Sequence, residues 1–155
     1  MIEPVSMTVV VPLPKERAFQ LFTSEIGSWW PLATHSIGQE STVSCGMEPR
    51  VGGALYESLS DGERHSWGRV VVWEPHDRVA FSWHPGHEES EAQQVEVRFT
   101  PDGSGTRVDL RHYGWEALAE KAQAVRDGYA NGWKHVFGEL FVEAARKAAA
   151  AEVLS

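Results

Sequence analysis

The last quarter of the chain predicts a long amphipathic helix. Between residues 115 and 151, apolar side chains recur in steps of three or four, which places them on one helical face. They are Tyr129, Trp133, Val136, Phe137, Leu140, Phe141 and Ala144. The opposite face is charged and carries Lys134, Glu139, Glu143 and Lys147. So wide an aromatic face has to be covered, and the middle of the chain offers a β-sheet for this purpose.

That middle part alternates apolar and polar residues with a period of two, which predicts β-strands. A first strand is expected at residues 5–11, followed by two short helices at residues 15–24 and 25–30. Further strands are expected at residues 42–47, 54–58, 65–74, 78–84, 95–99 and 106–113. Because short turns join them, they form an antiparallel meander with one face covered by the long helix. The predicted fold class is α+β, in a single domain of residues 1–155 whose tail, residues 148–155, frays.

Two glycines complicate the long helix. Gly128 and Gly132 lie one turn apart, and glycine is a poor helix former. Either they let the helix approach the sheet closely, or they mark a break. A break would leave residues 116–127 as a movable flap and residues 129–149 as the packed helix.

Charge and composition argue against several classes of partner. The formal net charge is −8 and no basic run is present, so neither nucleic acid nor an anionic membrane is an expected partner. Residues 1–5 lack the features of a signal peptide, and no apolar run approaches the ~20 residues that span a bilayer. Cys45 is the single cysteine, which excludes an internal disulfide and fits a reducing cytoplasm. We therefore expect a cytoplasmic location.

Several short motifs occur together in a characteristic order. They are Phe19 to Trp30 followed by Pro31, Pro49-Arg50-Val51-Gly52-Gly53, Trp67-Gly68-Arg69-Val70, Glu74 to Val79 running into Phe81-Ser82-Trp83, Gly105 to Val108 leading to His112-Tyr113-Gly114-Trp115, and Gly132-Trp133. In this order they resemble the START-like (SRPBCC) superfamily with its Bet v 1-like helix-grip fold. The branch that looks most similar contains the C-terminal domain of the activator of Hsp90 ATPase.

The resemblance covers nearly the whole chain. It implies a curved antiparallel sheet of about six to seven strands wrapped on the long helix, with a cavity for a hydrophobic or amphipathic small molecule between them. The additional N-terminal domain of the eukaryotic co-chaperones has no counterpart in this sequence, so activation of a chaperone is the weakest expectation.

The sequence contains no motif for a nucleophile, a bound phosphate or a metal. Gly103-Ser104-Gly105 lies between two strands, so a hairpin turn explains it better than a nucleophile turn. His84 and His87 are three residues apart in a loop, and a lone cysteine cannot build a thiolate zinc site. We expect no metal and no cofactor, with most histidines at the surface near strand ends.

Two histidines are candidates for chemistry. His112 shares its strand phase with Leu110, so it should point to the helix-covered face. There it is either a core histidine bonded to a neighbour or a polar anchor on a cavity wall, whose pKa desolvation would lower. His35 follows Trp29-Trp30-Pro31 in a loop, and the two indoles either cover the mouth of a pocket or fill the core.

Glu57 and Arg69 leave another alternative open. On adjacent strands they could form an ordinary cross-strand pair, whereas two inward-facing charges would be costly and more interesting. The period-two pattern does not decide between these faces, because bulges in a curved sheet shift it.

We interpret the chain first as a small-molecule binding protein without catalytic activity. A cyclase or aromatase that uses His112 or His35 as an acid–base group is the first alternative, and an Hsp90-type co-chaperone module is the second. A weak homodimer through an exposed strand edge is also expected. The candidate cavity residues are Trp30, His35, Phe81, Trp83, Val97, Phe99, Leu110, His112, Tyr129, Trp133 and Phe137.

Overall fold

One antiparallel sheet forms the body of the molecule in the computed structural model, which describes residues 2–154. Its strands are β1 (Val5–Val11), β2 (Thr42–Met47), β3 (Ala54–Leu59), β4 (Arg64–Glu74), β5 (Arg78–Trp83), β6 (Gln93–Asp102) and β7 (Gly105–Tyr113). Their order across the sheet is β1-β7-β6-β5-β4-β3-β2. The predicted α+β class and antiparallel meander are confirmed. Two residues lie outside the described range. They are Met1, at the start of the N-terminal segment considered above, and Ser155, at the end of the tail.

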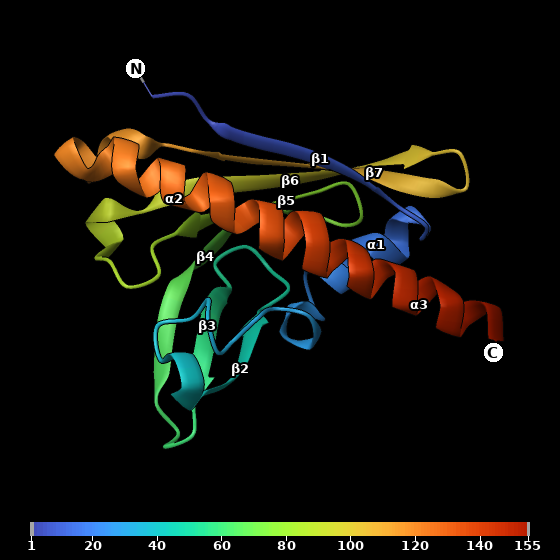
Figure 1. Cartoon of the computed structure of the whole chain (residues 1–155), viewed down its shortest axis with the longest axis horizontal. Helices are drawn as coiled ribbons and strands as arrows, with labels where there is room; N and C mark the ends of the chain where they lie inside the picture. Colours follow the sequence, from blue (N-terminus) through green and yellow to red (C-terminus); the bar gives the residue numbers. More distant parts are fainter. Residues whose placement is uncertain (1, 155) are drawn as a thin grey trace.

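The sheet is strongly curled. Register shifts interrupt the β2–β3, β3–β4 and β4–β5 pairs, and such bulges increase the local twist. Gly68 lies next to the bulge in β4, where a Cβ atom would collide with the backbone oxygen of Ser82 on β5. Only glycine permits this approach. As a result, β2 to β4 run across the direction of β1, β6 and β7 (Figure 1).

The C-terminal segment lies across one face of the sheet as a long helix (Figure 1). It consists of a 3-10 segment (Trp115–Lys121), α2 (Ala122–His135), a π-helical segment (Val136–Phe141) and α3 (Val142–Leu154). The helix passes through Gly128 and Gly132 without interruption, so the break considered there is wrong. The backbone leaves helical geometry earlier, at Ala119 (φ 50°, ψ −125°). Trp115 and Leu118 are each 1% exposed, so this segment is packed against the domain.

Smaller helical elements complete the fold. They are α1 (Lys15–Phe22) and the 3-10 turns Ile26–Ser28, Gln39–Ser41 and Glu89–Glu91. The second short helix, expected at residues 25–30, is thus a single turn. At the other end, α3 continues through Leu154, beyond the point where we expected fraying, and Arg17 forms an ion pair with Glu152 at 3.1 Å. Within residues 2–154, no helix is long and apolar enough to cross a membrane.

Helix α1 fills one half of the space between sheet and long helix. Its Phe19 and Phe22 rings contact Phe99 of β6 at centroid distances of 5.2 and 6.2 Å. Phe22 also meets Phe141 on the long helix at 5.4 Å. This half is a close-packed aromatic core, and the open space lies in the other half, beside α2.

Candidate functional site

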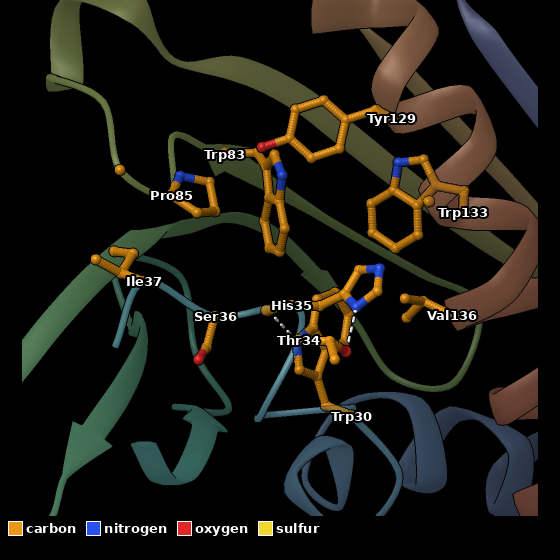
Figure 2. A pocket seen from close by; sticks show the side chains of 12 residues that line it. Trp30, Thr34, His35, Ser36, Ile37, Trp83, Pro85, Tyr129, Trp133 and Val136 are labelled. Carbon is orange, nitrogen blue, oxygen red and sulfur yellow. Dashed lines mark hydrogen bonds between the residues drawn. The ribbon is translucent and has the colours of Figure 1, made fainter. Parts of the chain in front are cut away.

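A pocket of about 370 Å³ lies between α2, the end of β5 and the loop before β2 (Figure 2). This volume falls within the range of about 300–1,000 Å³ that is usual for small-molecule sites. The lining residues are Trp30, Thr34, His35, Ser36, Ile37, Trp83, Pro85, Gly86, Tyr129, Gly132, Trp133 and Val136. No charged carboxylate, lysine or arginine is among them.

Three indoles form the apolar wall of the pocket. The ring centroids of Trp30, Trp83 and Trp133 lie 5.7–5.9 Å from one another, and no two of the rings stack in parallel. Each of these residues is at most 8% exposed. Trp67 supports Trp30 from behind at 5.2 Å. Large rings held by their neighbours present rigid π-surfaces, which suit a planar aromatic ligand.

A glycine on α2 leaves the helical wall of the pocket without a side chain at one position. Gly132 lines the pocket, and a Cβ atom added to it would meet no heavy atom within 4 Å. Glycine in a helix interior costs roughly 1 kcal/mol relative to alanine, and neither a positive φ nor a close backbone contact requires it here. Gly128 has the same free surroundings but is exposed and does not line the pocket. Gly132 therefore leaves room where a side chain would fill the cavity.

The polar rim of the pocket centres on His35. Its Nδ1 lies 2.7 Å from Thr34 Oγ1, and its backbone oxygen accepts a hydrogen bond from Trp30 Nε1 at 2.7 Å (Figure 2). Its Nε2 has no hydrogen-bond partner among the described residues. Burial lowers the pKa of His35, and His135, whose ring centroid is 5.7 Å away, lowers it further. His35 is therefore a neutral imidazole at neutral pH, with Nε2 left for a ligand.

The rim loop is anchored by a fully buried carboxylate, Glu57, which is 0% exposed. Its oxygens accept hydrogen bonds from the backbone N–H groups of Ile37 and Gly38 (2.7 Å each), from Thr42 Oγ1 (3.1 Å) and from Trp67 Nε1 (2.6 Å). His65 Nδ1 lies 3.3 Å away. Burial alone would raise the pKa of Glu57, but these hydrogen bonds together outweigh it and lower the pKa. Glu57 is thus an ionised group that fixes the loop carrying His35.

Arg69 is not the partner of Glu57. It lies opposite Ala54, its side chain is 66% exposed, and it faces Glu89 at 3.8 Å. Neither alternative left open for Glu57 and Arg69 is found, because the bulge between β3 and β4 turns Glu57 to the inward face and Arg69 to the outward face.

His112 is a structural histidine. It is 0% exposed, its Nδ1 accepts a hydrogen bond from Trp133 Nε1 at 3.0 Å, and Nε2 lies 3.2 Å from Gln93 Oε1. Because Nδ1 is an acceptor, the proton resides on Nε2, which donates to Gln93. Desolvation lowers the pKa of His112 to about 3. His112 holds the Trp133 ring in place from behind, and His112 itself does not line the pocket.

The comparison with known proteins fits this architecture. The family model "Activator of Hsp90 ATPase homolog 1-like protein" matches residues 12–145. The chain belongs to this family. The superfamily expected from the sequence motifs is thereby confirmed.

Solved structures of similar proteins share this fold. The anthrahydroquino-γ-pyrone synthase Txn09, solved with a bound ligand, is 34% identical over 80% of this chain and 84% of its own, with a TM-score of 0.57. Protein NE0264 from Nitrosomonas europaea is 14% identical over 98% of this chain and 99% of its own (TM-score 0.66). The Aha1 dimer from Colwellia psychrerythraea is 15% identical over 83% and 89% (TM-score 0.56). No curated protein matches the chain.

The pocket of this family member contains part of the predicted cavity set. Trp30, His35, Trp83, Tyr129 and Trp133 line it. The other candidates are buried but lie outside the pocket lining, namely Phe81, Val97, Phe99, Leu110, His112 and Phe137. Of the Trp pair, Trp29 packs on Phe141 at 5.2 Å in the core, while Trp30 is a buried residue of the pocket wall. That either indole covers the mouth of the pocket stays a prediction.

Several pocket residues were not foreseen from the sequence. They are Thr34, Ser36, Ile37, Pro85, Gly86, Gly132 and Val136. The loop residues carried a weak signal, because they adjoin His35 or follow Trp83 directly. Gly132 carried a stronger signal as a poor helix former, which we interpreted as a possible break and not as space for a ligand.

The remaining histidines were candidates for a metal site. Within residues 2–154, no cluster of three or more His, Cys, Asp or Glu side chains could hold a metal ion. His84 is only 6% exposed, so it is not the surface residue that its place at a strand end suggested. Its Nδ1 is buried and has no hydrogen-bond partner among residues 2–154.

Proposed function

We propose that the protein binds a small planar aromatic molecule in the pocket beside α2. The observation that carries this proposal is a cavity of about 370 Å³ walled by three buried indoles in an otherwise closely packed core. Protein interiors rarely contain voids much larger than a water molecule. Burial of a ligand there would remove apolar surface from water at about 25 cal/mol per Å². Gly132 supports the proposal, since its presence costs helix stability and leaves room in the cavity.

The ligand is expected to be an oxygenated polycyclic aromatic compound. This expectation draws on the 34% identity to a protein described as an anthrahydroquino-γ-pyrone synthase. It also agrees with a lining that combines aromatic walls with a few neutral polar groups. Binding of this kind is governed mainly by shape and stacking, with polar atoms fixing the orientation.

Native mass spectrometry of the freshly purified protein, together with quenching of tryptophan fluorescence by 9-fluorenone, tests the proposal. Retention of an aromatic metabolite, or saturable one-to-one quenching, is the expected result, because Trp30, Trp83 and Trp133 line the site. Absence of both a retained ligand and saturable quenching over a series of two-, three- and four-ring compounds would contradict it.

Catalysis on such a ligand is a second candidate function. The observation in its favour is His35, a rim histidine whose Nε2 has no hydrogen-bond partner among the described residues and whose pKa is lowered. A neutral imidazole can remove a proton adjacent to a carbonyl, which is a step that cyclisation chemistry requires. The neutral, solvent-excluded His112 is less suited, because both of its ring nitrogens are already hydrogen-bonded.

Proton exchange in D2O distinguishes this candidate from binding alone. Anthrone has an acidic methylene group, and its exchange can be followed by NMR. Catalysis predicts faster exchange with the native protein than with His35→Gln, while both bind anthrone with similar affinity. Equal exchange rates would leave binding as the function. Activation of an Hsp90-type chaperone and self-association stay predictions from the sequence.

A further inference from the structure

Two hydrogen-bond donors on the pocket wall form no hydrogen bond of normal geometry. Trp83 is 2% exposed, and its Nε1–H is buried without such a partner among residues 2–154. Tyr129, on α2, lines the same pocket, and its hydroxyl donates to no acceptor in the described part of the chain. Buried donors without a partner cost free energy, so native structures seldom leave them unused.

These two donors are adjacent. The Tyr129 hydroxyl lies beside the indole nitrogen of Trp83 at one end of the pocket (Figure 2). Burial raises the pKa of Tyr129, and the Trp83 N–H group offsets part of this effect. The phenol therefore stays protonated at neutral pH. With the indole N–H on the side of the phenol oxygen, the hydroxyl proton is free to point into the cavity.

Other polar groups of the lining are already engaged. Ser36 Oγ donates to the backbone oxygen of Leu32 at 2.5 Å and contacts Thr42 Oγ1 at 2.9 Å. Thr34 Oγ1 contacts His35 Nδ1. Apart from His35 Nε2 on the rim, the Tyr129 hydroxyl, beside which the Trp83 N–H group lies, is therefore the polar side-chain group left to a ligand.

The charge of the lining further limits which ligands can bind in the pocket. No lysine or arginine lines the pocket, and the pKa of His35 is lowered, so an anionic ligand would have no counter-charge there. The net charge of −8 also disfavours anions. The acceptor that best fits a neutral hydroxyl donor is a neutral carbonyl oxygen.

We propose that Tyr129 and Trp83 form a recognition site for a ligand carbonyl, so that the pocket selects aromatic ketones, quinones or pyrones over hydrocarbons of the same shape. This inference rests on the proposed binding function and specifies its ligand class. Tyr129 supplies the hydroxyl that meets the carbonyl oxygen, and Trp83 orients that hydroxyl. The indole walls bind the rings of either class of compound.

The pair 9-fluorenone and fluorene tests this selection, because the two differ chiefly in one carbonyl group. The native protein should bind fluorenone more tightly. Tyr129→Phe should weaken fluorenone binding about 3- to 10-fold, the value of one neutral hydrogen bond, and leave fluorene binding unchanged. Tyr113→Phe is the matched control, since Tyr113 lies outside the pocket and packs under Arg111, and it should change neither affinity.

Infrared spectroscopy gives a second measurement that does not depend on affinity. The carbonyl stretch of bound fluorenone should lie at lower frequency in the native protein than in Tyr129→Phe. Equal affinities of the native protein and Tyr129→Phe for fluorenone, with an unchanged carbonyl stretch, would overturn the inference while leaving the binding function intact. Failure of the native protein to bind either compound would overturn both.

Discussion

The buried His112 makes the protein sensitive to mild acid. Its imidazole is 0% exposed and neutral, and it links Trp133 to Gln93 through both ring nitrogens. Protonation would place a charge in the core and would remove the acceptor for Trp133 Nε1. The folded state therefore resists protonation of His112, whereas the unfolded chain accepts the proton near pH 6.5.

The size of the effect follows from the two pKa values. The unfolded histidine has a pKa near 6.5 and the folded one a pKa of about 3. Above pH 6.5 both states are neutral and stability is fully present; below it the unfolded state binds one more proton, and stability falls until about pH 3. Between about pH 7.5 and about pH 5, the expected loss in the free energy of unfolding is about 2 kcal/mol.

Urea denaturation followed by tryptophan fluorescence measures this loss. His112→Gln keeps an acceptor and a donor in the network but does not titrate, so its stability should change much less over the same pH interval. His35→Gln serves as the control for a more exposed histidine. The NMR signals of His112 should also show no titration above about pH 4 in the folded native protein. A stability that is flat from about pH 7.5 to about pH 5, or a normal titration of His112 in the folded protein, would contradict the assignment of His112 as a neutral buried histidine.

Two further predictions concern the core near the rim. Glu57→Gln should lower the free energy of unfolding by about 2 kcal/mol or more, because an amide cannot accept all the hydrogen bonds that the buried carboxylate receives; a loss below about 0.5 kcal/mol in urea denaturation would speak against the anchor. Burial and the nearby Glu57 raise the pKa of the Cys45 thiol to about 12. Cys45 should therefore react with a disulfide reagent only after denaturation, and rapid reaction of the folded protein would disagree with this.

The architecture could be predicted from the sequence because burial imposes a period. Core residues of a strand, such as Val97, recur at every second position, and those of a helix, such as Phe137, recur every three or four positions. The sequence therefore predicts both the sheet and the helix that covers it. Strand pairing also followed from the short turns. The resemblance of ordered motifs to a helix-grip family agreed with these elements.

The site could be predicted only in part, for a physical reason. A buried residue faces either another side chain or a cavity, and this depends on what lies across from it. Phe99 and Phe137 have the same character as Trp83 and Trp133, but Phe22 packs on the first two and leaves the second two free to line a pocket. The sequence carries no periodic signal for such a difference.

Local irregularities were also hard to assign. Bulges around β3 and β4 change the phase of the strands, which is why the inward face of Glu57 and the outward face of Arg69 were not decided beforehand. Gly132 looked like a helix break because propensity describes the backbone alone. Tertiary packing keeps the helix continuous. Because Gly132 has no side chain, it leaves space in the pocket.

The binding of 9-fluorenone to Gly132→Leu and Gly128→Leu tests whether the pocket beside α2 is the ligand site. Both changes replace a helical glycine whose surroundings are free, so both proteins should remain folded and gain roughly 0.5–1 kcal/mol of helix stability. The leucine side chain introduced at position 132 would occupy the pocket, whereas the one introduced at position 128 would lie in solvent. Gly132→Leu should weaken fluorenone binding by about tenfold or more, while Gly128→Leu should bind like the native protein. Native-like binding by Gly132→Leu would contradict this location of the site.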